Sequence, residues 1–145
     1  MITDLNASPI VLPAADRETY DWSEVAHMWD SNDFPGVHDW LNARWSRLVQ
    51  NRLLGHEDPD ARFLQGLAFA ALALHFTQVA NQEGALLMLD DALVVLSTYR
   101  PGHLGVRVQP ILDSLLELRP LLAGLAPDAE CPVQPFVYRK FEYRS

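Results

Sequence analysis

Three side chains that can bind ligands or donate hydrogen bonds follow one stripe of a predicted helix. His38, Asn42 and Trp45 are spaced four and three residues apart, which places them on the same face of an α-helix. His75 lies in a second predicted helix that is otherwise apolar. A buried His75 needs a hydrogen-bond partner, because an unpaired buried polar group costs about 1–3 kcal/mol. These residues are expected to turn inward between the two helices, where they can form either a small-ligand or metal site or a buried structural polar network, and the sequence leaves both open.

Motifs that define the common enzyme classes are missing from the sequence. There is no glycine-rich phosphate loop, no G-x-S-x-G elbow and no C-x-x-C pair. Glu24 and His27 match the E-x-x-H spacing of di-iron bundles, but those bundles use two such pairs and the sequence contains one. We interpret Glu24 and His27 as a chance match on an acidic surface helix.

Length, composition and charge narrow the class of protein. The chain has 145 residues, of which 49% are hydrophobic and 21% charged, as expected for one domain with a sizeable core. Its one cysteine cannot form an internal disulfide or a cysteine-based zinc site, which excludes a disulfide-stapled secreted scaffold. The net charge of −8 argues against nucleic-acid binding, which needs a basic face. Residues 1–39 carry eight acidic residues and one basic residue, so the acidic charge is concentrated there.

The sequence contains no targeting or membrane-spanning segment. Met1 to Pro13 lacks the basic start and the apolar core of a signal peptide. The longest weakly polar run, residues 63–76, is shorter than the ~20 apolar residues that cross a bilayer, and it includes Gln65 and His75. We therefore expect a soluble, cytoplasmic protein that binds neither membranes nor nucleic acid.

Hydrophobic periodicity predicts an all-α, compact single-domain bundle of about five helices and no strands. The first helix is expected from about Glu18 or Asp21 to residue 31, and the others at about residues 35–54, 59–80, 82–98 and 110–120. Asp58 and Pro59 are predicted to begin the third helix, and Asn81 to cap either the end of the third or the start of the fourth. Pro120 is predicted to end or kink the fifth helix.

The ends of the chain are predicted to be extended. We divide the sequence into an acidic arm, a helical-bundle domain and a C-terminal strap rich in proline and aromatic residues, at residues 1–15, 16–125 and 126–145. Residues 131–145 carry a net charge of +2, which favours docking on the acidic N-terminal region. We expect the strap to pack on its own chain, with exchange into a homodimer as the alternative.

Two segments in matching order and spacing carry a family resemblance. The first is residues 34–45, FPGVHDWLNARW, and the second begins with FLQGL at residues 63–67 and continues to Ala85. Over about residues 25–118 the chain resembles the domain of unknown function 309 (DUF 309), a family of small helical bundles labelled predicted metal-dependent hydrolases. The resemblance implies a polar or ligand-binding cluster, which would consist of His38, Asp39, Asn42, Trp45, Gln65, His75 and Asn81.

The same resemblance implies a divalent metal held by His38, Asp39 and His75, with a bound water as nucleophile. The sequence departs from the family where Asn42 replaces a glutamate, and Asp39 is a shorter acid than the family's. No general base is then left beside the ligands, so we assign no catalytic residue and no established cofactor. We favour binding or self-association, as a monomer or homodimer with an unidentified protein or small-molecule partner. The metal-dependent hydrolase is the alternative.

Overall fold

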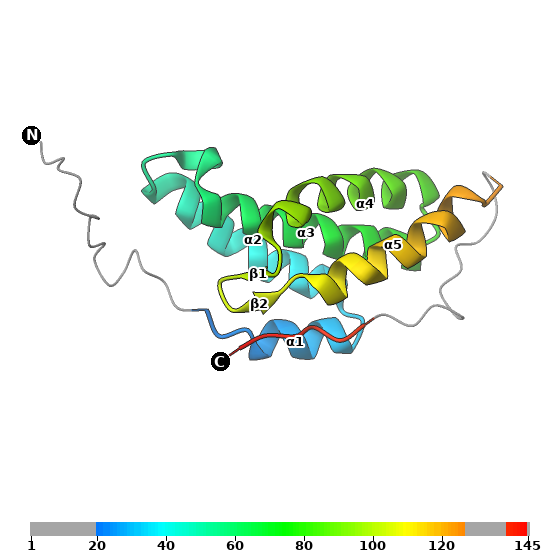
Figure 1. The fold of residues 1–145 in the computed structure, drawn as a ribbon, viewed down its shortest axis with the longest axis horizontal. Coiled ribbons are helices and arrows are strands. Elements are labelled where there is room, and N and C mark those ends of the chain that lie inside the picture. Colours follow the sequence, from blue (N-terminus) through cyan, green and yellow to red (C-terminus); the bar gives the residue numbers. More distant parts are fainter. Residues whose placement is uncertain (1–19, 127–138, 145) are drawn as a thin grey trace, which may run out of the picture.

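The computed structural model describes residues 20–126 and 139–144, and within them the predicted all-α bundle is confirmed (Figure 1). The five helices are α1 (Ser23–Asp30), α2 (Phe34–Asn51), α3 (Pro59–Gln78), α4 (Gln82–Leu96) and α5 (Gln109–Ala123). Two short 3₁₀ turns follow α2 and α4, namely η1 (Gly55–Glu57) and η2 (Ser97–Tyr99). A small antiparallel hairpin lies before α5, with strands β1 (Gly102–His103) and β2 (Val106–Arg107).

Three helices begin directly after a residue whose side chain caps the helix. The side chains of Asp33, Asp58 and Asn81 accept hydrogen bonds from backbone N–H groups in the first turns of α2, α3 and α4. These bonds satisfy N–H groups that have no partner within the helix. Asn81 is therefore the N-cap of α4, one of the two roles predicted for it. The left-handed residue that ends α3 is its neighbour Ala80, with φ of 59°.

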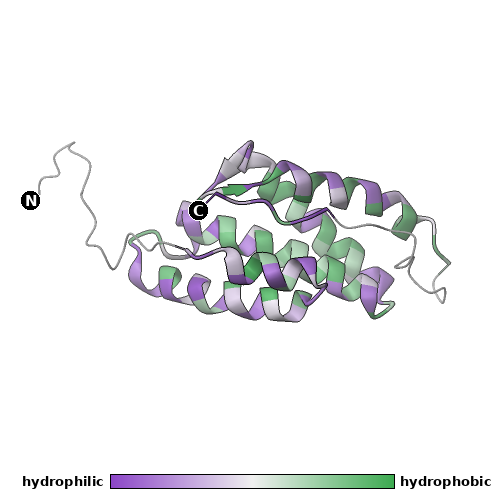
Figure 2. Ribbon diagram, turned by 90° about the horizontal axis from the view of Figure 1, so that it is seen from below, coloured by the Kyte–Doolittle hydropathy of each residue, from purple (hydrophilic) through white to green (hydrophobic). Residues whose placement is uncertain are grey.

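Helix α3, whose apolar residues are spread all round its surface, lies in the middle of the bundle. It packs against α2 on one side and α4 on the other, α5 packs on α4, and α1 packs on α2 (Figure 1). Hydrophobic residues gather where the helices face one another (Figure 2). Gly66 lets α3 and α4 approach closely, because a Cβ atom at this position would lie 2.7 Å from Cγ1 of Val95. An all-round apolar surface on α3 is thus explained by neighbours on two sides.

The second helix ends at Asn51, earlier than the predicted end near residue 54. Of the two effects predicted for Pro120, ending the fifth helix is wrong, because α5 continues to Ala123. Proline removes one backbone hydrogen bond, the one that would reach the carbonyl of Leu116. Leu116 and Pro120 are both exposed, so water can satisfy that carbonyl and the helix continues.

The hairpin was not predicted. Its turn residues Leu104 and Gly105 have φ of 51° and 85°, as a two-residue turn with both φ values positive requires. Leucine rarely adopts this conformation, and two-residue strands are too short to show an alternating pattern. The indole N–H of Trp22 donates to the carbonyl oxygen of Leu104 at 2.8 Å and so fixes the turn against the bundle.

The described part of the strap, residues 139–144, runs along α1 and beside β2 of the same chain (Figure 1). Phe141 is 5% exposed, and its ring lies against Trp22 and Trp29 with centroids 5.8 and 5.7 Å away. The strap thus completes the aromatic core around α1. The other predicted strap aromatics, Phe136 and Tyr138, and the acidic arm lie outside the described residues.

Candidate functional site

Four of the seven predicted site residues meet between α2 and α3. His38, Asn42 and Trp45 of α2 and Gln65 of α3 line a cavity of about 100 Å³, which we call the α2–α3 pocket. Its remaining walls are the side chains of Ala68, Phe69 and Leu72. The stripe predicted on the second helix therefore does face the third helix, with polar groups from both helices above an apolar wall.

The indole N–H of Trp45 is the unusual group of this pocket. It is buried, and no described residue accepts a hydrogen bond from it. The indoles of Trp22 and Trp29, by contrast, donate to the backbone carbonyls of Leu104 and Arg139. A buried donor without a partner costs about 1–3 kcal/mol, and native proteins contain few of them. This N–H is therefore a buried donor that lacks an acceptor among the described residues, on a residue whose side chain also lines the pocket.

The other three predicted site residues lie elsewhere. The side chain of Asp39 is 85% exposed, and its nearest polar contact is Nδ1 of the adjacent His38 at 3.3 Å. His75 is one turn beyond the pocket on α3, where its ring packs on Phe76 with centroids 5.8 Å apart. Asn81 caps α4 through the N–H of Gly84. The structure therefore separates the cluster implied by the resemblance into a pocket and three independent positions.

The predicted burial of the cluster is wrong. Asn42 is exposed, and His38, Gln65 and His75 are half-buried. The core-facing side of α2 is occupied by its fully buried apolar residues Val37 and Leu41. The polar stripe lies beside that face, at the edge of the α2–α3 contact, where side chains reach solvent.

The ligand set predicted for a metal is likewise not assembled. Across residues 20–126 and 139–144, no three His, Cys, Asp or Glu side chains are grouped so that they could hold a metal ion. Asp39 follows His38 directly, and adjacent side chains point about 100° apart around a helix. The two side chains therefore cannot both face α3. His38, Asp39 and His75 thus do not form one site in this structure.

A second polar cluster was not predicted and lies at the start of α3. Arg52 donates to Oδ1 of Asp58 at 3.1 Å and to Oδ2 of Asp60 at 3.2 Å, and Nε2 of His103 lies 2.8 Å from Oδ1 of Asp60. The hydroxyl of Tyr99 donates to the carbonyl of Pro59, and burial raises the pKa of Tyr99. The acidic pair was visible in the sequence, but its contact with His103 depends on the hairpin. We interpret the cluster as structural, because its hydrogen bonds and ion pairs join the end of α2, the start of α3 and the hairpin.

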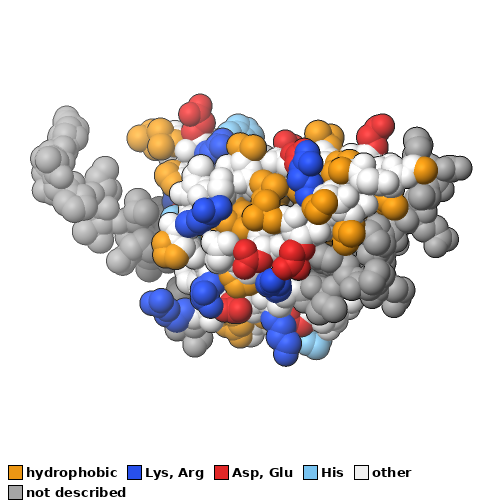
Figure 3. Space-filling view, turned by 45° about the vertical axis from the view of Figure 1, so that its right-hand side comes forward, with side chains coloured by type: hydrophobic (Ala, Val, Ile, Leu, Met, Phe, Trp, Pro, Cys, Tyr) orange, Lys and Arg blue, Asp and Glu red, His pale blue; other side chains and the backbone are white. Residues whose placement is uncertain are grey.

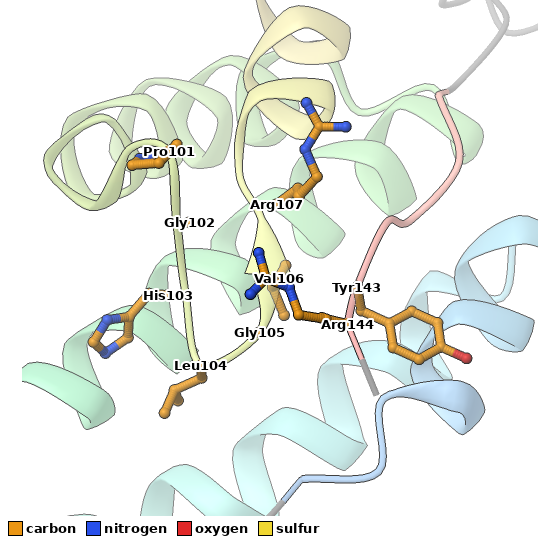
Figure 4. Close-up of a pocket in the computed structure, with 9 residues that line it drawn as sticks. All are labelled: Pro101, Gly102, His103, Leu104, Gly105, Val106, Arg107, Tyr143 and Arg144. Atoms are coloured by element: carbon orange, nitrogen blue, oxygen red, sulfur yellow. The ribbon is translucent and has the colours of Figure 1, made fainter.

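A larger cavity of about 580 Å³ lies between the hairpin and the strap (Figure 4). Figure 4 shows the side chain of Arg144 reaching across β2 toward Val106, while His103 points away from the cavity. Arg107 forms an ion pair with Glu142 of the strap. The wall formed by Tyr143 and Arg144 belongs to the strap, so this cavity exists only while the strap is docked.

Exposed hydrophobic side chains form no broad patch on the face drawn in Figure 3, where they are interspersed with charged ones. Several are nevertheless prominent, namely Leu53, Leu54, Val79, Leu87, Val94, Leu116 and Leu121. Scattered apolar residues of this kind are common on protein surfaces. The pockets, rather than an apolar surface, are therefore the better candidates for binding.

Comparisons with protein-family models, with curated proteins and with solved structures find no match to this chain. In the part of the chain that the structure describes, no helix has the length and apolar character needed to cross a membrane. The geometry of the pockets and the strap is therefore what bears on function.

Proposed function

We propose that this protein is a binding protein whose α2–α3 pocket receives a small oxygen-bearing group, such as a carboxylate or an amide carbonyl. The observation that carries the proposal is the buried indole N–H of Trp45, for which no described residue supplies an acceptor. The pocket offers further hydrogen-bonding groups on His38, Asn42 and Gln65. A ligand oxygen would give the indole its missing hydrogen bond, provided that the Trp45 ring moves enough to open its nitrogen, which is fully covered in this structure, to the pocket.

The size of the pocket limits what it can hold. Whole drug-sized ligands occupy cavities of about 300–1,000 Å³, and this pocket measures about 100 Å³. It fits one chemical group of side-chain size, which belongs to a small metabolite or to a residue of a partner protein. The apolar wall of Ala68, Phe69 and Leu72 favours a group that joins a polar head to a short hydrocarbon stem.

Membership of DUF 309 is part of the same proposal. His38, Trp45 and Gln65 stand at motif positions of that family and line the pocket together. The metal-dependent hydrolase is not proposed, because its three ligands do not come together among the described residues.

The experiment is a titration followed by ¹H–¹⁵N NMR of the indole N–H signals. The chain has four tryptophans, and Trp45→Phe identifies the signal of Trp45. Acetate and acetamide are the probes, and methylammonium, which has no acceptor, is the control. We expect a saturable shift of the Trp45 signal with a Kd of about 1–10 mM, as suits ligands of four heavy atoms. The signals of Trp22 and Trp29 should stay in place because their N–H groups are already bonded.

A pair of matched variants tests the location of the site. Asn42→Leu changes a residue that lines the pocket, whereas Asn51→Leu changes an exposed asparagine at the end of the same helix. The first should weaken acetamide binding several-fold, and the second should leave it unchanged. A Trp45 signal that does not move with any probe, or equal effects of both variants, would refute the proposal.

A further inference from the structure

The strap is held by backbone and side-chain contacts in a groove formed by α1, α5 and β2, which we call the strap groove. The indole N–H of Trp29 donates to the carbonyl of Arg139 at 3.1 Å. The N–H of Arg139 donates to Oγ of Ser114, and that of Phe141 to Oδ1 of Asp30, both at 3.1 Å. Three helix side chains thus bind main-chain groups of the strap, and such bonds do not depend on which residues the strap carries.

The strap also extends the hairpin as a third, short strand. Tyr143 pairs antiparallel with Val106 of β2. The N–H of Arg107 donates to the carbonyl of Glu142 at 3.0 Å, and the N–H of Arg144 donates to the carbonyl of Gly105 at 2.7 Å. Adding an extended peptide to the edge of a sheet is a common mode of peptide recognition, in which main-chain bonds supply affinity.

Side chains on either side of this backbone ladder supply selectivity. The ring of Phe141 fills an aromatic pocket between Trp22 and Trp29. Arg139 forms ion pairs with Glu117 and Asp113 of α5.

The acidic position of the strap has a partner as well, because Glu142 forms an ion pair with Arg107 of β2. The groove therefore recognises a basic residue, an aromatic residue two positions later and an acidic residue directly after it. Lys140 makes no ion pair within the described residues and projects into solvent between these contacts.

We propose that the strap groove is a docking site for an extended segment of a partner protein with this basic–x–aromatic–acidic pattern, and that the strap occupies it in cis. Residues 127–138 connect α5 to the strap and could span about 40 Å when extended. The helix from Ser114 to Ala123 is about 14 Å long. The connection is thus not taut and does not itself hold the strap in the groove, so the contacts of residues 139–144 alone would have to be matched by a competing segment.

The test uses the full chain, with a protease site inserted between Ala129 and Glu130. After folding and cleavage the strap is a separate peptide, and a labelled peptide of residues 136–145 is added. We expect the labelled peptide to bind the cleaved protein, as followed by fluorescence anisotropy, and the indole N–H signal of Trp29 to report occupancy by NMR. Phe141→Ala in the peptide should weaken binding at least ~10-fold, whereas Lys140→Glu should leave it unchanged.

A charge reversal tests the pattern itself. Arg139→Glu in the peptide should weaken binding, and Glu117→Arg in the protein should restore binding of that altered peptide. If cleavage unfolds the protein, the uncleaved chain with Phe141→Ala, whose own strap is weakened, is titrated with the same peptides.

Three results would overturn the proposal. A folded, cleaved protein that fails to bind the peptide would show that the groove takes no ligand in trans. Binding that ignores both Phe141 and the charge at residue 139 would show that the groove does not select the pattern. Exchange of straps between two tagged copies of the uncleaved chain, with a dimer seen by light scattering, would assign the groove to a second copy instead of a different protein.

Discussion

The indole N–H of Trp29 in α1 donates a hydrogen bond to the carbonyl of Arg139, 110 residues further along the chain. Trp22, in the turn before α1, makes the corresponding bond to Leu104, 82 residues away. Two tryptophans at the N-terminal end of the bundle thus hold the hairpin and the strap, while Trp45 has no acceptor among the described residues. The same side-chain group is hydrogen-bonded in two places and lacks an acceptor among the described residues in a third.

Replacing these tryptophans by phenylalanine should have unequal effects on stability. Trp29→Phe removes a satisfied hydrogen bond and leaves the carbonyl of Arg139 without its donor, so we expect a loss of about 1–3 kcal/mol in the free energy of unfolding. Trp45→Phe removes a donor that had no partner, and its cost should stay below about 1 kcal/mol. Urea denaturation measures both, and an equal loss in the two variants would mean that the Trp45 N–H is hydrogen-bonded in solution.

Ala80→Gly should stabilise the protein. Ala80 has φ of 59° at the end of α3, a conformation that costs a residue with a Cβ about 1–2 kcal/mol and costs glycine little. Glycine also loses more chain entropy on folding, so the net gain should be about 0.5–1 kcal/mol. The matched control is Ala43→Gly at an exposed position inside α2, which should cost about 1 kcal/mol. The prediction is wrong if both changes lower the melting temperature.

Gly66→Ala should destabilise the contact between α3 and α4. The added Cβ would lie 2.7 Å from Cγ1 of Val95 and 2.9 Å from Cδ2 of Leu96, closer than packed carbon atoms approach. Overpacking of this kind costs about 1–3 kcal/mol. Val95→Ala makes room for the new methyl, so the double variant should be more stable than the sum of the two single losses predicts. Additive losses, measured by chemical denaturation, would argue that α4 simply shifts away.

The ion pair between Asp90 of α4 and Arg119 of α5 should make the free energy of unfolding depend slightly on pH in the acidic range. Arg119 donates to both carboxylate oxygens of Asp90, at 2.8 and 3.1 Å, and this hydrogen bonding lowers the pKa of Asp90 from its usual 3.8. A carboxyl group whose pKa is lower in the folded than in the unfolded state stabilises the folded protein at pH values above the unfolded-state pKa. This stabilisation is lost as the pH falls through the folded-state pKa.

The comparison of wild type with Arg119→Gln checks this ion pair. The difference in melting temperature between them should be present at pH 7 and should shrink as the pH falls below 3.8 and through the lowered pKa of Asp90. Because both side chains are nearly half exposed, added salt should also reduce the difference at pH 7. A difference that persists at low pH would indicate that Arg119 contributes through packing instead.

The sequence predicts the helices well because their signals are local. The caps Asp58 and Asn81 act within three residues of themselves, and the apolar stripes repeat every three or four residues. The stripe of His38, Asn42 and Trp45 likewise locates one wall of the pocket. Periodicity gives the angle between residues around a helix, but not how far the helix is rolled toward the core. For that reason the sequence predicts an interior position for a stripe that in fact lies at the edge of the contact between α2 and α3.

Features that depend on distant contacts could not be predicted. The left-handed conformation of Leu104 is held by a hydrogen bond from Trp22, and the bond from His103 to Asp60 joins residues 43 positions apart. The pairing of Tyr143 with Val106 likewise joins segments that are far apart in the sequence. No local pattern records these contacts, because each one forms only after the helices are packed.

The contact between α1 and the strap also has a consequence for synthesis on the ribosome. Asp30 and Phe141 are hydrogen-bonded although 111 residues separate them, and translation at about 5–20 residues per second needs roughly 6–22 s to cover that interval. During this time Trp29 does not yet have its final contacts. Its indole N–H lacks the carbonyl of Arg139 as acceptor, and Phe141 does not yet cover its ring. The first helix of the described residues is therefore among the last to be completed, and we expect a nascent chain halted before residue 139 to display an aromatic surface that the finished protein conceals.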